Sequence, residues 1–112
     1  MELQKVTSMI MIASERIDKA TREIYKLAEK KAETEEYFRI ALAKEKFILK
    51  DQGMAITLID DLARGKEDIA RLKRDRDLAE DMFKAAIESL RALQAELSGL
   101  QSILRFQSDV GG

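Results

Sequence analysis

Apolar residues recur along this chain at alternating spacings of three and four residues, and they form two long stripes. The first stripe has fourteen positions and is interrupted only at Lys31, Thr34 and Glu45. Its apolar members are Leu3, Val6, Ile10, Ala13, Ile17, Ala20, Ile24, Leu27, Phe38, Ala41 and Ile48. The second stripe has eleven positions, with Arg76 as the one polar member. The others are Ile69, Leu72, Ala79, Phe83, Ala86, Leu90, Leu93, Leu97, Leu100 and Leu104. A seven-residue repeat of this length predicts a left-handed coiled coil rather than two ordinary amphipathic helices.

The segment between the stripes predicts where the helices end. No proline interrupts the chain, so nothing forbids helix along its length. Gly53 is the predicted end of the first helix, Thr57 is the predicted N-cap of a short helix, and Gly65 closes that helix. We therefore expect one domain, residues 1–112, in four parts. These parts are a long helix 2–50, a turn and short helix 51–65, a long helix 66–108 and a frayed tail 109–112.

A short connection between two long helices favours an antiparallel arrangement. The predicted fold is thus all-α, an antiparallel helical hairpin with a short connecting helix. Folding back about the middle of the chain places Glu45 near Arg71 or Arg74.

A two-helix hairpin covers each seam residue from one side only, and several large apolar residues also lie outside both stripes. A monomer would leave this area in water, so the sequence predicts a homodimer or a higher even oligomer that forms a helical bundle. The predicted oligomer seam comprises Ile10, Ile17, Ile24, Leu27, Phe38, Phe83, Leu90, Leu93, Leu97 and Leu104.

Composition narrows the possible chemistry. With 20 basic and 21 acidic side chains, the chain lacks the cationic surplus of most nucleic-acid binders. Histidine and cysteine are both absent, which removes the usual general base, the thiolate nucleophile and the commonest metal ligands. We therefore expect no catalytic residues, no metal site, no cofactor and no enzymatic activity. No apolar run reaches the ~20 residues that span a bilayer, so we expect a cytoplasmic protein with no membrane partner.

The polar positions within the stripes allow two interpretations. Polar seam residues can specify register and oligomer number, or can pack their stems while their charged ends reach water. Alternatively, Lys31, Thr34, Glu45 and Arg76 mark a pocket where the seam opens. The tract from Arg71 to Asp77 is likewise either a face laced with ion pairs or an anion contact.

The connecting segment is the most specific candidate site. Lys50, Thr57 and Arg64 could gather at the N-terminus of the short helix, whose free amides attract anions. Arg76 is a further candidate ligand residue if the site lies at a subunit junction. The alternative is a capped turn with solvated side chains.

The connecting segment also resembles that of small coiled-coil accessory proteins from phages and prophages of Gram-positive bacteria. The resemblance is carried by Leu49–Gly53, Ile59–Gly65, Ala79–Glu80, Ala85–Ala86 and Leu100–Leu104, within about residues 25–105. It implies a phage accessory protein that acts by binding in the host cytoplasm.

Three functional hypotheses follow. The leading one is an oligomeric interaction protein that engages a host or phage macromolecule, including a role against host defence. The second is a sponge that sequesters an anionic nucleotide signal through Lys50, Thr57, Arg64 and Arg76. The third is a weak nucleic-acid-binding accessory protein, which the charge balance disfavours.

Overall fold

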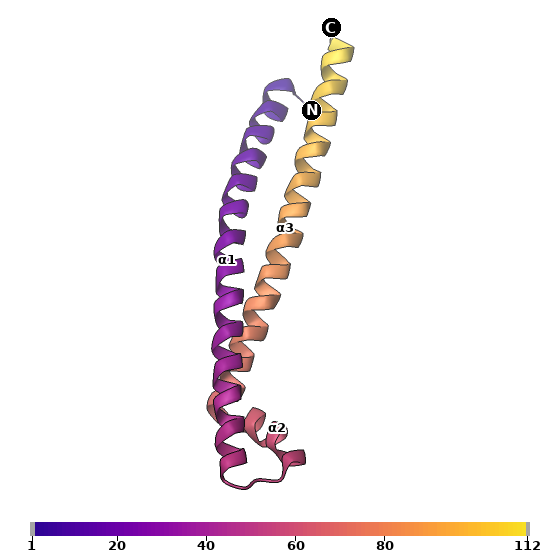
Figure 1. Cartoon of the computed structure of the whole chain (residues 1–112). Coiled ribbons are helices and arrows are strands. Elements are labelled where there is room, and N and C mark those ends of the chain that lie inside the picture. Colours follow the sequence, from indigo (N-terminus) through magenta and orange to yellow (C-terminus); the bar gives the residue numbers. More distant parts are fainter. Residues whose placement is uncertain (1, 112) are drawn as a thin grey trace. The chain divides into compact units, whose positions relative to one another are not determined.

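The computed structural model describes residues 2–111 and forms three α-helices, with no strand in that range (Figure 1). Helix α1 spans Leu3–Asp51, α2 spans Ile56–Gly65 and α3 spans Glu67–Gly111. The all-helical prediction is confirmed. Helix α3 continues past residue 108, so the segment expected to fray from 109 is helical as far as Gly111, and Gly112 lies outside the described residues.

The chain divides into two compact units, which we call the terminal unit (Met1–Lys26 with Lys84–Gly112) and the turn unit (Leu27–Phe83). In the terminal unit, Val6, Ala13 and Leu100 are buried. Arg16 of α1 forms an ion pair there with Glu96 of α3, at 3.7 Å. The two helix segments of this unit therefore pack against each other along their apolar stripes.

In the turn unit the chain folds back on itself, and α2 lies at the turn (Figure 1). Helix α1 ends in a Schellman motif: Met54 N–H donates to the Leu49 carbonyl and Gly53 N–H donates to the Lys50 carbonyl, both at 3.0 Å. Gly53 has φ of +80°, a conformation that only glycine adopts without cost. The prediction that Gly53 ends the first helix is confirmed.

Two local predictions were wrong. Ala55, not Thr57, is the N-cap of α2, and it makes no side-chain capping bond, so Thr57 lies inside the first turn. Glu45 forms an ion pair with Lys66 at 2.9 Å, rather than lying near Arg71 or Arg74. The ion pairs of Glu45 with Lys66 and of Glu35 with Arg76 show that the chain folds back a few residues earlier than the sequence suggested.

The two stripes face inward. All eleven positions of the second stripe are buried or half-buried, and Leu3 and Ile48 are the exposed exceptions in the first. Most of these residues are only half-buried, and of the predicted oligomer seam Phe38 alone is fully buried. Two helices thus cover their stripes incompletely.

Candidate interaction surface

Phe38 is the centre of the turn unit. Its ring is 2% exposed and packs in a core with Leu42, Ala63 and Ile69, which come from all three helices. Two cations lie over the ring: Arg76 Cζ is 4.5 Å and Arg64 Cζ 5.8 Å from its centroid. Phe38 therefore connects α1 to both α2 and α3, through apolar packing and through cation–π contacts.

Helix α2 is held on one flank of α1 by charge. Asp60 accepts from Lys46 of α1 at 2.6 Å and from Arg64 of its own helix at 3.0 Å. Hydrogen bonds from Lys46 and then from Arg64 lower the pKa of Asp60 below its usual value. Leu42 and Lys46 are one helical turn apart, so α2 covers the row of α1 that contains both.

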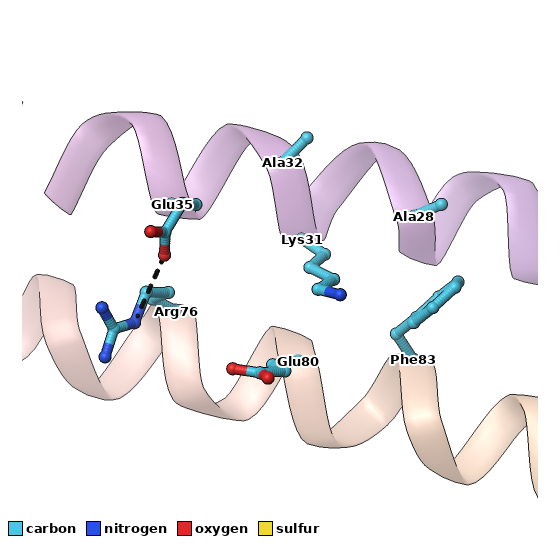
Figure 2. Close-up of a pocket in the computed structure, with 7 residues that line it drawn as sticks. All are labelled: Ala28, Lys31, Ala32, Glu35, Arg76, Glu80 and Phe83. Atoms are coloured by element: carbon cyan, nitrogen blue, oxygen red, sulfur yellow. Dashed lines mark ion pairs between the residues drawn. The ribbon is translucent and has the colours of Figure 1, made fainter. Parts of the chain in front are cut away.

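On that same flank, beyond α2, the seam opens into a hollow of about 510 Å³ (Figure 2). Lys31 and Arg76, two of the polar stripe residues, line it together with Phe83 and Glu80. Lys31 Nζ is 5.0 Å from the Phe83 ring centroid, and Arg76 forms an ion pair with Glu35 at 3.5 Å. The lining carries two positive and two negative side chains, so it has no net attraction for an anion.

The opposite flank of the turn unit carries a groove of about 400 Å³, and Thr34, another of the polar stripe residues, lines it. The seven other lining residues are Lys30, Glu33 and Tyr37 of α1 with Asp75, Leu78, Ala79 and Met82 of α3. Its large apolar side chains are open to water: Tyr37 is 52%, Leu78 57% and Met82 48% exposed. The negative charge of Glu33 and a hydrogen bond with it raise the pKa of Tyr37. We call this surface the Tyr37 groove.

The four candidate ligand residues fall into two places. Lys50 borders a small hollow with Lys46, and Thr57 is exposed in the first turn of α2. Arg64 and Arg76 instead meet at the Phe38 ring, and each also binds a carboxylate. The structure brings Arg64 and Arg76 together but does not gather all four residues around one cavity.

The basic tract of α3, from Arg71 to Asp77, forms ion pairs along its length. Arg71 binds Glu67, Lys73 binds Asp77 at 2.9 Å and Arg74 contacts Asp75 at 3.3 Å. Hydrogen bonds from Lys73 and then from Arg76 lower the pKa of Asp77. The interpretation of this tract as a solvated, ion-paired face is confirmed.

The described residues contain no cluster of side chains suited to a metal ion. Across residues 2–111, no helix has the length and apolar character needed to cross a membrane. Comparison with protein families, with curated proteins and with solved structures found no match.

Tyr37, Leu78 and Met82 are among the large apolar residues that lie outside both stripes, and the sequence analysis did not predict that they share one groove. The spacing of these residues in the sequence does indicate the groove. Lys30, Glu33 and Tyr37 recur at spacings of three and four, as do Asp75, Leu78 and Met82, so each set forms one row on its helix.

Proposed function

We propose that the chain is a non-enzymatic interaction protein that self-associates into a helical bundle and engages a macromolecule through the surface that the bundle leaves open. The observation that carries this proposal is the exposed surface of a single chain, in which many large apolar side chains lie in water. The chain exposes 8277 Å² in all, polar and apolar surface together. A compact monomer of 12.8 kDa exposes only about 6,300 Å².

The excess, about 2,000 Å², is more than one partner buries in a standard protein interface, ~800 Å². Large apolar side chains are among the exposed residues, in the terminal unit Met11 and Ile12 and in the turn unit Tyr37 and Leu78. Covering apolar surface stabilises by ~25 cal/mol per Å² before the entropy of association is subtracted. Self-association therefore stabilises the fold itself.

The macromolecular partner that we propose belongs to a phage or its host, following the resemblance of the connecting segment. The most exposed apolar side chains of the turn unit, Ile56 at 81% and Phe47 at 71%, lie at the end of α1 and the start of α2. They are the surface that we assign to such a partner.

Sedimentation equilibrium or light scattering across the micromolar range tests the self-association. We expect a dimer or a higher even oligomer. A stable monomer throughout that range contradicts the proposal.

A nucleotide signal is not the ligand that we propose, because Arg64 and Arg76 already bind carboxylates and the Phe38 ring. A thermal-shift screen with nucleotides and cyclic dinucleotides checks this choice. We expect no shift, whereas a shift of several degrees with one compound would replace the protein-partner proposal with sequestration.

A further inference from the structure

The two ends of the Tyr37 groove differ in charge. The register of the turn unit follows from two ion pairs, Glu35 with Arg76 and Glu45 with Lys66. In that register Lys30 lies level with Met82 at one end of the groove, and Tyr37 lies level with Asp75 at the other. One end is therefore positive and the other negative, with Glu33 and Leu78 between them.

Both rim charges reach the surface. No ion pair of Lys30 is found among the described residues, and Asp75 pairs there with the neighbouring Arg74 at 3.3 Å, with half of its side chain exposed. Tyr37, Leu78 and Met82 supply the exposed apolar surface of the groove.

We infer that the Tyr37 groove binds a second copy of this chain. The two copies dock antiparallel about a two-fold axis through the middle of the groove. The inference rests on the proposed self-association and adds its location and orientation. A two-fold axis places the same patch on both sides of the interface, so the patch must complement itself.

The two rim charges distinguish the orientations, because Glu33, halfway along the groove, comes level with its own copy in either one. In the antiparallel arrangement, Lys30 of each chain comes level with Asp75 of the other, and this contact occurs twice. In a parallel arrangement, the two Lys30 side chains would meet each other and so would the two Asp75 side chains. Opposite charges across an interface favour one register, and like charges disfavour the other.

A second copy also fits this surface better than an unrelated partner of one charge. The rim carries both signs, which a uniformly acidic or basic partner would meet with repulsion at one end. The other flank is already occupied near the turn by α2 through the Lys46–Asp60 ion pair. The Tyr37 groove is thus the flank of the turn unit that α2 leaves open.

The first test compares two exposed leucines, Leu78 in the groove (57% exposed) and Leu58 on α2 (50% exposed). We expect Leu78→Lys to raise the dimer dissociation constant at least tenfold and Leu58→Lys to leave it unchanged, with circular dichroism confirming the helix content of both. If the wild-type chain is a monomer, the proposed function fails. If the wild type associates and Leu78→Lys associates equally well, only the assignment of the groove fails.

The second test addresses orientation by exchanging the rim charges. Lys30→Glu alone sets Glu against Asp75 at both contacts, and Asp75→Lys alone sets Lys against Lys30, so each single variant should dissociate about tenfold more readily. An equimolar mixture of the two variants restores both attractions, and we expect it to form heterodimers of near wild-type affinity. A mixture that shows no preference for the heterodimer overturns the antiparallel arrangement.

Discussion

The guanidinium of Arg76 lies over the ring of Phe38, with Cζ 4.5 Å from the ring centroid, while its Nε is 3.5 Å from a carboxylate oxygen of Glu35. Arg76 occupies the one polar position of the second stripe, and its side chain is only 23% exposed. An aromatic face and a carboxylate stabilise a cation that has lost most of its hydration. The seam thus accommodates the arginine through specific partners instead of through full solvation.

Phe38 should be the most sensitive core position of the turn unit. Its ring contacts residues of α2 and α3 and both arginines, so Phe38→Ala should lower the free energy of unfolding by about 3–5 kcal/mol. Phe47→Ala is the matched control, because Phe47 is 71% exposed and its loss should change stability by no more than about 0.5 kcal/mol. Urea denaturation at a fixed protein concentration measures both, and equal effects would contradict the central role of Phe38.

Two glycines should respond to alanine with opposite signs. Gly53 has φ of +80°, so Gly53→Ala should destabilise the chain by about 1–2 kcal/mol although the added Cβ meets no atom within 4 Å. Gly99 lies inside α3 with open space around it, so Gly99→Ala should stabilise the chain by up to about 1 kcal/mol. Thermal melts of the two variants at one concentration provide the measurement. A loss of stability in both would show that packing, not backbone conformation, governs these sites.

Acid should loosen α2 before it unfolds the long helices. Bonds from Lys46 and Arg64 lower the pKa of Asp60 from its usual 3.8. A lowered pKa in the folded state means that the stabilisation is present above about pH 3.8 and is lost as the pH falls through the folded-state pKa. Amide exchange in α2 should therefore accelerate in that acid range.

The Asp60→Asn variant should show fast exchange in α2 already at neutral pH. The neighbouring Asp61→Asn is the control, because no ion pair of Asp61 is found among the described residues. Equal behaviour of the two variants would mean that Asp60 does not hold α2 in place.

Alkaline pH should act at the start of α3. The hydrogen bond and the charge of Glu45 raise the pKa of Lys66 above its usual 10.5. A raised pKa means that the stabilisation is complete below pH 10.5 and is lost as the pH rises through the folded-state pKa. Lys66→Arg keeps its charge at that pH, so its melting temperature should fall less between pH 9 and 11.5 than that of the wild type. Parallel declines would exclude this ion pair as the cause.

The stripes could be predicted from the sequence because a heptad position is a local property, set by spacing along one helix. The same holds for Gly53, whose role follows from its own backbone freedom. The partner of Glu45 could not be predicted in this way. A shift of a few residues in the fold-back replaces Arg71 or Arg74 with Lys66, and the point of fold-back is set by contacts between helices, not by spacing along one helix.

The candidate site was harder to predict than the fold. Thr57 has the chemistry of a cap, yet α2 begins two residues too early for it to act as one. Arg64 and Arg76 are possible anion ligands by their charge, but each already pairs with a nearby carboxylate, Asp60 four residues before Arg64 and Asp77 next to Arg76. Their meeting at the Phe38 ring depends on three helices in contact, which no single periodic pattern records.

The position of α2 on one flank gives the turn unit a front and a back. If both flanks were exposed, each molecule could bind a different neighbour on each side, and such association would continue without closing. In the proposed dimer, α2 keeps the other flank out of the interface near the turn, so the contact through the Tyr37 groove is made once and closes on itself.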